Sequence, residues 1–256
     1  MKLGAMNDPK QDLYKQITWI GENRFNFLDL TLEPEKSYSE DVDVDKVKKL
    51  LKKYKLDIIG HTPWSLPLAS PYKSVRKAAL DEFYKCLDVF SKLGVKLVNV
   101  HPFMPHDLAD PDKILQYNIE SFRSIVKKAR DIDIMMENTQ GIFNELGIIA
   151  KILEDVKGLW LHWDIGHANL GNEGEKKTKL AFMKFDKKIK HLHLSDNNGT
   201  EDQHLPIGTG NIHWPFIIEV LKEHKYKKTI TLEIHSLDLS YILFTRDKLN
   251  YLLKST

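Results

Sequence analysis

Residues 159–195 read LWLHWDIGHANLGNEGEKKTKLAFMKFDKKIKHLHLS and contain one copy of the pattern that decides the fold. The run LWLHWD (159–164) is nearly continuous in apolar and β-favouring residues, which is typical of a strand covered on both faces in a parallel sheet. A helical pattern follows at 176–188, and a second strand is expected at 190–195. This strand–helix–strand order predicts an α/β fold.

The same alternation extends in both directions along the chain. Eight strands with intervening helices in 256 residues predict an α/β protein, a single (β/α)8 TIM barrel that spans residues 1–256 as one domain. An open doubly wound sheet is the alternative, because periodicity does not show whether a sheet closes. Ser74 and Asp110 are the expected N-caps of the helices 74–93 and 111–130, and Gly94 and Gly158 come just past the ends of the helices 74–93 and 144–155. The expected strands are 2–6, 25–32, 57–61, 95–101, 132–137, 159–164, 190–195 and 229–234, and the expected helices are 45–55, 74–93, 111–130, 144–155, 176–188, 213–224 and 239–254.

Composition and charge argue against several classes of function. The chain has 38 basic and 36 acidic residues and a formal net charge of +2, which argues against a strongly basic nucleic-acid-binding protein. The single cysteine, Cys86, lies on the apolar face of a helical pattern and is expected in the core, without a disulfide. The first ten residues, MKLGAMNDPK, lack the apolar core of a signal peptide, and no window has the ~20 apolar residues of a membrane span. We therefore expect a soluble, cytoplasmic protein.

Imidazole and carboxylate side chains recur at the ends of the expected strands. In a barrel these ends meet at one side, where TIM-barrel active sites are built. Clustered carboxylates repel one another unless cations neutralise them, so the pattern indicates a metal centre. The strand-end residues are His61, His101, Glu137, Asp164, His193 and Glu233; His167 follows shortly after, and Asp202 and His204 lie in the loop TEDQHLP.

A donor set of histidine nitrogen and carboxylate oxygen suits Zn²⁺, Mn²⁺, Co²⁺ or Fe²⁺ better than Ca²⁺ or Mg²⁺. Because several carboxylates can bridge cations, we expect one to three divalent ions, Zn²⁺ or Mn²⁺. His162 and His191 each precede a candidate ligand by two residues, so they are expected deeper on the same strand face. His235 is a further candidate for the lining of the site. The glycines of IGTGNI (207–212) are expected to let the backbone approach a ligand closely.

Six motifs along the chain are similar to those of the xylose isomerase-like TIM-barrel superfamily, which includes sugar and sugar-phosphate isomerases and epimerases and endonuclease IV. The resemblance covers nearly the whole chain and implies a metal-dependent enzyme on a TIM barrel. The motifs are HTPWSLPLASP (61–71), VNVHP (98–102), MENT (136–139), DIGHANL (164–170), HLHLSDNNGTEDQHLPIGTGNI (191–212) and LEIH (232–235).

The resemblance also assigns roles to the candidate ligands. The superfamily's common cation site is similar to Glu137, Asp164, His193 and Glu233, and in its epimerase-like members the two glutamates are also the acid–base pair. The larger, three-zinc set of endonuclease IV matches as well. It implies a first zinc at His61, His101 and Glu137, a second at the common site with Glu137 bridging, and a third at His167, Asp202 and His204.

Other positions depart from the endonuclease IV pattern. Trp64 and Pro67 stand where that family usually has tyrosine and asparagine, and Gly166 stands where it favours cysteine. The loop EPEKSYSEDVDVD (33–45) is acidic where a DNA-gripping loop is expected to be basic.

Two enzymatic functions and one non-enzymatic function follow. The first is an isomerase or epimerase of a small sugar or sugar phosphate, with Glu137 and Glu233 as acid and base and Trp64 and Trp163 as candidates for the pocket lining. The alternative is a trinuclear zinc phosphodiesterase, in the extreme an abasic-site DNA endonuclease. A metal- or sugar-binding barrel without catalysis is the third. The departures favour the first, which has a small-molecule sugar rather than DNA as its partner.

Overall fold

The computed structural model describes residues 1–105 and 110–255, and its eight strands follow one another in chain order, β1 to β8, in the order of a closed barrel. The predicted (β/α)8 TIM-barrel fold is confirmed, and the open sheet is excluded. The chain divides into two compact units, which are described separately below. Whether it behaves as one domain over 1–256 stays a prediction. Unit 1 comprises Met1–Met6, Asn138–Ile149 and Leu161–Thr256, and unit 2 comprises Asn7–Glu137 and Ala150–Trp160.

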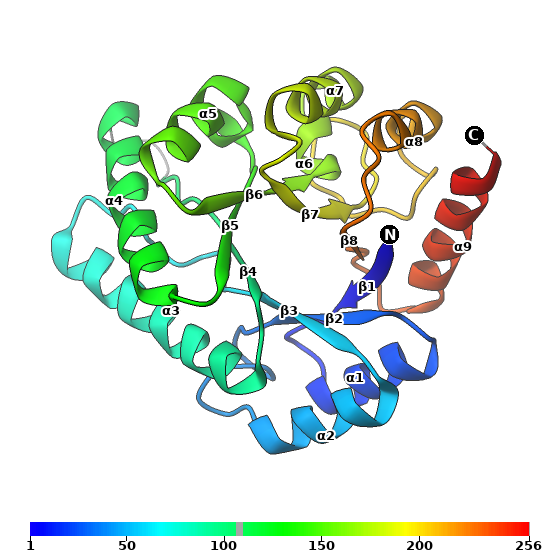
Figure 1. Ribbon diagram of the computed structural model, residues 1–256, viewed down its shortest axis with the longest axis horizontal. Helices are drawn as coiled ribbons and strands as arrows, with labels where there is room; N and C mark the ends of the chain where they lie inside the picture. Colours follow the sequence, from blue (N-terminus) through cyan, green and yellow to red (C-terminus); the bar gives the residue numbers. More distant parts are fainter. Residues whose placement is uncertain (106–109, 256) are drawn as a thin grey trace. The chain divides into compact units, whose positions relative to one another are not determined.

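Unit 2 contains four parallel strands and the helices between them. β2 pairs with β3, β3 with β4, and β4 with β5. Figure 1 shows α1 to α4 following one another outside these strands. Buried Phe27, Ile59 and Met135 form a core cluster against which Leu97 and Trp160 pack. The elements are α1 (Leu13–Glu22), β2 (Phe27–Thr31), α2 (Val44–Tyr54), β3 (Asp57–His61), α3 (Lys73–Leu93), β4 (Leu97–Val100), α4 (Pro111–Ala129) and β5 (Asp133–Glu137).

Unit 1 likewise consists of parallel strands with helices between them. β6 pairs with β7, β7 with β8, and β8 with β1, all in parallel. Apolar side chains such as Leu161, Leu192 and Ile230 are fully buried on these strands. The elements are β1 (Lys2–Met6), the 3₁₀ helix η1 (Gly141–Asn144), β6 (Leu159–Asp164), α6 (Ile165–Asn169), α7 (Gly174–Phe185), β7 (Ile189–Leu194), α8 (Trp214–Glu223), β8 (Thr229–Leu232) and α9 (Ser240–Ser255); α5 (Leu146–Asp155) and β6 each run from one unit into the other.

The helix ends follow local capping chemistry, with two differences from the sequence analysis. Asp110 caps α4 by accepting a hydrogen bond from the Asp112 backbone N–H, and Gly94 ends α3 with a left-handed φ of 78°. Ser74 is not a cap, because α3 begins one residue before it. Helix α1 was not expected; its N-cap is Asp12, whose side chain accepts from the Lys15 backbone N–H.

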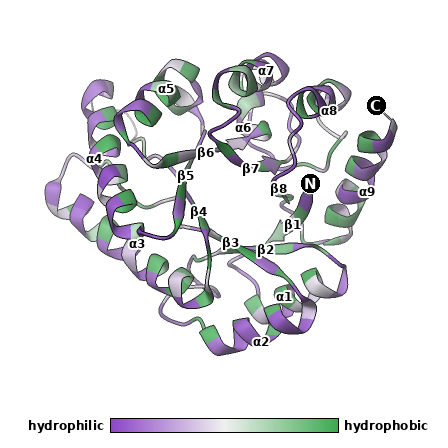
Figure 2. Cartoon of the chain, viewed as in Figure 1, coloured by the Kyte–Doolittle hydropathy of each residue, from purple (hydrophilic) through white to green (hydrophobic). Residues whose placement is uncertain are grey.

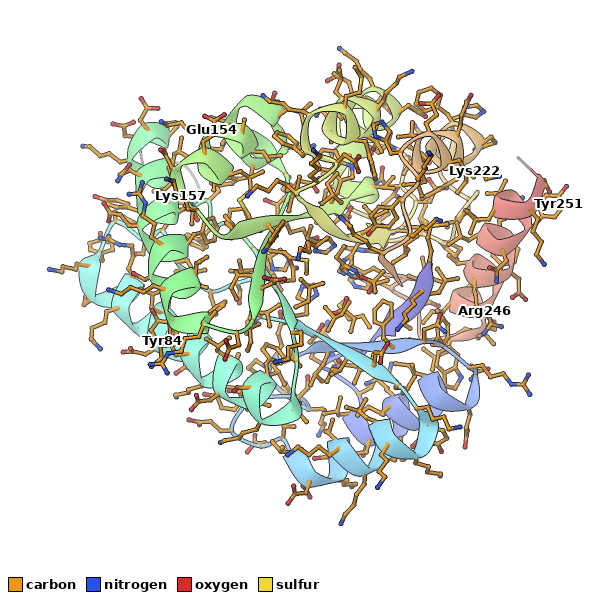
Figure 3. The ribbon with its side chains drawn as sticks, in the orientation of Figure 1. Tyr84, Glu154, Lys157, Lys222, Arg246 and Tyr251 are labelled. Carbon is orange, nitrogen blue, oxygen red and sulfur yellow. The ribbon has the colours of Figure 1, made fainter. Side chains whose placement is uncertain are left out.

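The helices present one apolar face to the strands. In α2, Val47 and Leu51 are buried while its lysines face solvent, and Figure 2 shows this helix mostly in the hydrophilic colour on its outer side. In Figure 3, Tyr251 lies on the outer side of α9, where its side chain is 63% exposed. Among the described residues, none of the helices combines the length and the apolar character needed to cross a membrane.

Cys86 on α3 is 3% exposed, and burial raises the pKa of its thiol to about 12. A thiol with that pKa is a poor nucleophile at neutral pH, which agrees with the expected core position.

Candidate metal centre

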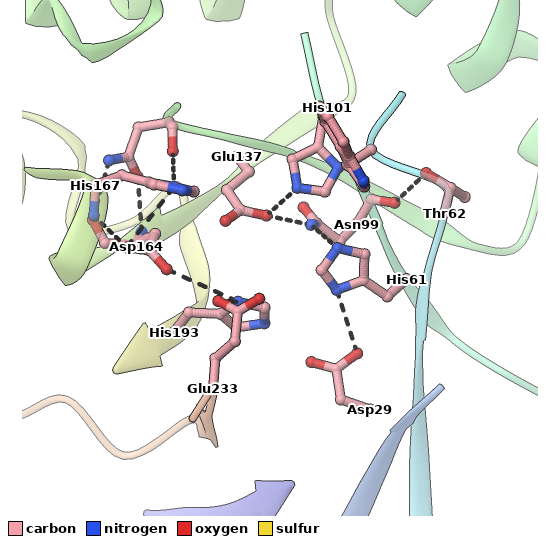
Figure 4. A network of polar contacts seen from close by, with 12 residues as sticks. Asp29, His61, Thr62, Asn99, His101, Glu137, Asp164, His167, His193 and Glu233 are labelled. Atoms are coloured by element: carbon pink, nitrogen blue, oxygen red, sulfur yellow. Dashed lines mark hydrogen bonds and ion pairs between the residues drawn. The ribbon is translucent and has the colours of Figure 1, made fainter. Parts of the chain in front are cut away.

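Three candidate ligands lie together in unit 2. His61 is the last residue of β3, Glu137 is the last residue of β5, and His101 directly follows β4. The His101 Nε2 lies 3.0 Å from Glu137 Oε2, and the ring centroids of His61 and His101 are 5.0 Å apart (Figure 4). One ligand atom from each residue lies within 4.8 Å of the other two. The three side chains therefore present two imidazoles and a carboxylate to one position.

Two polar residues that the sequence analysis did not select support this group. The Asn99 side-chain amide donates a hydrogen bond to Glu137 and lies 3.3 Å from the His61 Nε2. Behind His61, the Asp29 Oδ1 lies 3.8 Å from the imidazole Nδ1. Both residues are 1% exposed, and most other residues of their strands are apolar. A carboxylate inside the apolar run FLDLT was the available signal for Asp29.

The loops after β2 and β3 meet through Glu33 and Trp64. The Glu33 carboxylate accepts a hydrogen bond of 2.9 Å from the Trp64 backbone N–H. Burial raises the pKa of Glu33, and this hydrogen bond and the electrostatic interaction with His101 oppose the rise. The Trp64 side chain is 68% exposed. Trp163 is fully buried and donates its indole N–H to Thr178 over 3.2 Å, so its expected place in a pocket lining is wrong and it packs the core instead.

Unit 1 brings together three further candidate ligands. Asp164 ends β6, His193 lies near the end of β7, and Glu233 directly follows β8. The His193 Nδ1 lies 2.8 Å from Glu233 Oε2 and 3.8 Å from Asp164 Oδ2 (Figure 4). The Asn138 side chain makes two hydrogen bonds to the Asp164 backbone. Its Oδ1 accepts from the Asp164 N–H over 2.7 Å, and its amide N–H donates to the Asp164 carbonyl over 3.0 Å. These side chains are all less than 10% exposed.

The last three candidates form a second group in unit 1. The Asp202 Oδ2 lies 3.0 Å from the His167 Nε2 and 3.0 Å from the His204 Nε2. His167 is placed by α6, whose N-cap Asp164 accepts a hydrogen bond of 2.5 Å from the His167 backbone N–H. The structure therefore brings all three residues together around one carboxylate.

Charge and burial determine the protonation of this group. Burial by itself raises the pKa of Asp202, but hydrogen bonds from His167 and His204 outweigh burial and hold that pKa well below its usual range. Burial lowers the pKa of His204, whereas Glu233, Asp202 and Asp164 raise it, and the net effect brings it to about 9. The three carboxylates therefore favour the protonated form of the His204 imidazole.

The loop that carries Asp202 and His204 is organised by the buried carboxylate of Asp196. Its Oδ2 accepts hydrogen bonds of 2.8 Å from the Gly208 N–H and from the Trp214 indole N–H. A Cβ at Gly210 would stand 2.3 Å from Asp196 Oδ1. The glycines at 208 and 210 therefore allow the loop to pack on Asp196; that the glycines of IGTGNI also let the backbone approach a ligand stays a prediction.

Gly166 is required by its own surroundings. A Cβ on this residue would lie 2.5 Å from Ser195 Oγ and 3.2 Å from Asp164 Oδ1. The position at which the endonuclease IV pattern favours cysteine thus has no room for a side chain in this chain.

The remaining histidines of unit 1 differ in environment. His191 is fully buried, and its ring nitrogens lie 2.8 Å and 3.0 Å from the hydroxyls of Thr229 and Thr231. His162 is equally buried, with its ring 4.0 Å from that of His193. Both therefore lie beneath the candidate ligands as expected. His235 is exposed, and its ring stacks on His204.

The residues present fit a divalent cation. The groups around His101 and around His193 combine imidazole nitrogen with carboxylate oxygen, the donors of Zn²⁺ and Mn²⁺ sites. The contacts of Asp202 with His167 and His204 combine the same two kinds of donor. The buried Asp202 Oδ1 accepts no hydrogen bond from the part of the chain that the structure describes, and a cation would supply the missing partner. That these residues bind metal stays a prediction.

Comparison with known proteins identifies the family. A family model described as xylose isomerase-like TIM barrel matches residues 21–250. The chain belongs to this family. Within the xylose isomerase-like TIM barrels, the chain is 32% identical over 235 residues to an uncharacterized protein of Methanocaldococcus jannaschii, covering 87% of this chain and 79% of that protein. It is 24% identical over 244 residues to a probable endonuclease 4 of Aquifex aeolicus, covering 83% of each. The resemblance noted in the sequence is confirmed.

Solved structures of the same fold include sugar epimerases. A D-tagatose 3-epimerase-like protein superimposes with a TM-score of 0.90 at 27% identity, covering 99% of this chain and 97% of its own. A D-psicose 3-epimerase from Clostridium cellulolyticum H10 superimposes with a TM-score of 0.78 at 18% identity, covering 99% of both chains, and shows the fold alone.

Proposed function

We propose that this chain is a divalent-metal-dependent epimerase or isomerase of a small sugar or sugar phosphate. The observation that carries the proposal is a glutamate paired with a histidine at two strand ends. Glu137 lies 3.0 Å from His101, and Glu233 lies 2.8 Å from His193. Proton transfer at a carbon beside a carbonyl requires a positioned base and acid. The 27% identity to a D-tagatose 3-epimerase-like protein over nearly the whole chain supports this chemistry.

The cation would be held by the residues that the family resemblance assigns to its common site. A bound Zn²⁺ or Mn²⁺ would supply Lewis-acid polarisation of a substrate carbonyl and the hydroxyl beside it. The proposed ligands are Glu137, Asp164, His193 and Glu233.

Glu137 and Glu233 would exchange the proton. One carboxylate removes the proton from the carbon beside the carbonyl, and the other glutamate, protonated, returns a proton to the opposite face of that carbon, so the configuration inverts. Asn99 and His101 fix the orientation of Glu137, and His193 fixes that of Glu233. Each carboxylate is thereby held in one position before substrate binds, which lowers the entropic cost of the transfer.

The alternative is a trinuclear zinc phosphodiesterase that acts on abasic DNA. One observation favours it: Asp202, His167 and His204 are in contact, as the third zinc of endonuclease IV would require. The charge of the chain opposes it, because 38 basic and 36 acidic residues leave little surplus to hold a polyphosphate backbone.

Metal stoichiometry and two assays on one preparation separate these functions. Protein purified without chelator is analysed for bound Zn²⁺ and Mn²⁺, then incubated with a panel of ketoses and ketose phosphates and, separately, with an abasic-site duplex. Glu233→Gln tests the site, and Glu219→Gln on the exposed side of α8 is the matched control. We expect epimer or isomer formation by the wild type and Glu219→Gln, loss in Glu233→Gln, and an intact duplex. Near three tightly bound zinc ions with strand cleavage would contradict the proposal.

A further inference from the structure

Two loop residues of unit 2, Glu33 and Trp64, lie beside the candidate ligands and have no role in the proposed chemistry. Glu33 follows β2 and Trp64 follows β3. The two loops start side by side, because the Leu32 backbone N–H donates to the His61 carbonyl over 3.0 Å. Further along, the Glu33 Oε1 accepts the 2.9 Å hydrogen bond from the Trp64 backbone N–H. The pair therefore lies at the same ends of the strands as His61 and His101.

Trp64 presents an apolar surface next to a buried candidate ligand. Its side chain is 68% exposed, whereas His61, three residues earlier, is 3% exposed. The hydrogen bond to Glu33 holds the Trp64 backbone, so the exposed indole starts from a fixed position. Small-molecule sites combine aromatic surfaces with a few placed polar groups, and a flat indole can pack on the C–H face of a sugar. The exposed indole therefore suits a sugar as its ligand.

Glu33 supplies a polar group beside this surface. Its Oε1 is used by the Trp64 N–H, and its Oε2 makes neither a hydrogen bond nor an ion pair with any residue that the structure describes. Burial raises the pKa of Glu33, while the Trp64 N–H and the electrostatic interaction with His101 lower it. The carboxylate is thus close enough to interact with the ring that contacts Glu137. Its second oxygen can accept a hydrogen bond from a sugar hydroxyl.

The loops that follow the strands are acidic in both units. Among the described residues, these loops contain eight acidic residues and two lysines in unit 2, and seven acidic residues and neither lysine nor arginine in unit 1. The two lysines, Lys10 and Lys36, share their loops with seven of the eight acidic residues. The loops counted are 7–12, 32–43, 62–72 and 101–110 in unit 2, and 138–145, 170–173, 195–213 and 233–239 in unit 1.

The backbone donors that could bind a phosphate are also occupied. TIM barrels often bind phosphate through the loops after strands 7 and 8 and through helix N-termini. In unit 1, Asp196 accepts hydrogen bonds from the Gly208 and Ile212 N–H groups, and Asp238 accepts one of 2.9 Å from the N–H of Ser240, the first residue of α9. In unit 2, aspartates cap α1, α2 and α4. The chain's own carboxylates therefore take the positions that a phosphate would need.

We propose that Glu33 and Trp64 form the subsite for the part of the sugar away from the reacting carbon, and that this subsite accepts a free sugar and rejects its phosphate ester. The indole packs on the sugar, and Glu33 accepts a hydroxyl proton. A phosphate in place of that hydroxyl brings a charge of about −1.5 to −2 against the carboxylate. This inference rests on the proposed function, which leaves the choice between sugar and sugar phosphate open.

Pairs of a ketose and its terminal phosphate test the selectivity of the metal-loaded full chain. We expect kcat/KM for the phosphate to be lower by about 100-fold or more, because like charges in contact are costly. Equal or faster turnover of a phosphate would overturn this inference and leave the epimerase proposal standing. Turnover of no sugar of either kind would refute the proposed function, and this inference with it.

Variants of the two residues test the subsite itself. Glu33→Gln removes the charge at nearly constant shape, and we expect it to narrow the preference for the free ketose by about tenfold, mainly through KM, because Glu33 does not touch the reacting carbon. Trp64→Ala should raise KM for the free ketose by about tenfold with little change in kcat. Glu35→Gln, on an exposed residue of the same loop, is the matched control. An unchanged preference in Glu33→Gln would overturn its role.

Fluorescence shows whether Trp64 contacts the sugar without relying on turnover. Trp64→Phe keeps an aromatic ring, so the difference between the emission of the wild type and of this variant belongs to Trp64. We expect a free ketose that the wild type converts to change this difference, and its terminal phosphate at the same concentration to leave it unchanged. No change with the converted ketose would overturn the role of Trp64, and an equal change with the phosphate would overturn the selectivity.

Discussion

At the residue scale, the charge on His204 makes the metal-free protein sensitive to pH. Burial lowers the pKa of His204, but Glu233, Asp202 and Asp164 raise it to about 9 in the folded chain, from an ordinary value of 6.5. Because the folded-state pKa is raised, its stabilising contribution is fully present below pH 6.5 and is lost as the pH rises through about 9.

We therefore expect the free energy of unfolding of the metal-free wild type to fall between pH 6.5 and 9, by at most about 3 kcal/mol from this group. Urea unfolding at a series of pH values measures the fall. His204→Asn should flatten the profile in that interval. An equal slope in wild type and variant would assign the pH dependence to other groups.

The close packing of Gly166 against the Ser195 side chain leads to a second prediction at the residue scale. Gly166→Ala would place a Cβ 2.5 Å from Ser195 Oγ, and overpacking of this kind costs about 1–3 kcal/mol. Ser195→Ala alone should change stability little, because Ser195 Oγ has no hydrogen-bond partner among the described residues. The double variant should recover part of the loss, which a double-mutant cycle by urea unfolding measures. Strict additivity of the two changes would show that this contact is not the cause.

At the element scale, Asp196 determines the order of the loop between β7 and α8. Besides the Gly208 and Trp214 donors, its Oδ1 accepts from the Asn197 N–H over 3.0 Å and from the Ile212 N–H over 3.3 Å. Replacing one oxygen by an amide nitrogen would set a donor against a donor and leave buried groups unpaired, at a cost of about 1–3 kcal/mol.

Asp196→Asn should therefore increase amide hydrogen exchange over residues 197–212 and weaken metal binding by His204 on the same loop. Hydrogen exchange followed by mass spectrometry measures the first effect, and Zn²⁺ titration measures the second. Glu201→Gln, an exposed acidic residue of the same loop, is the control and should behave as wild type. Protection in Asp196→Asn equal to that of the control would refute this role.

The elements themselves were predictable where periodicity was strong. All eight strands were predicted, because their apolar runs are covered on both faces. Helix α1 was missed although Asp12 caps it and Leu13, Ile17 and Ile20 share its buried face, because the β-favouring ITWI run obscures the helical period. The five-residue α6 was missed because a helix so short has no measurable period.

At the scale of the whole molecule, the positions of residues at the ends of the predicted strands identify the candidate ligands. These positions do not predict which of the ligands are in contact. Residues at the carboxyl ends of barrel strands can be selected from sequence, because every strand of this fold runs the same way. The Asn99 contact with Glu137 and the stacking of His235 on His204 depend on strand register and on a loop conformation with positive φ. Neither follows from the spacing of residues.

The two-glutamate mechanism predicts different partial reactions in the two glutamate variants. Glu137→Gln and Glu233→Gln should each abolish epimerisation, because each removes one of the two proton carriers. Each variant should still exchange the proton of the epimer that its remaining glutamate deprotonates. Incubating either purified epimer in D₂O and following deuterium by NMR measures this. Exchange of both epimers by one variant would show that a single group serves both faces.

The central claim, metal-dependent epimerisation of a sugar, is tested most directly by the wild type in D₂O. Protein loaded with Zn²⁺ or Mn²⁺ is incubated with the ketose panel, and products are analysed by NMR for configuration and deuterium. We predict a new epimer or isomer carrying one deuterium at the carbon where the proton was exchanged, with the activity lost on chelation and in Glu233→Gln. No deuterium incorporation from any sugar, together with metal-dependent cleavage of an abasic-site duplex, would contradict the claim.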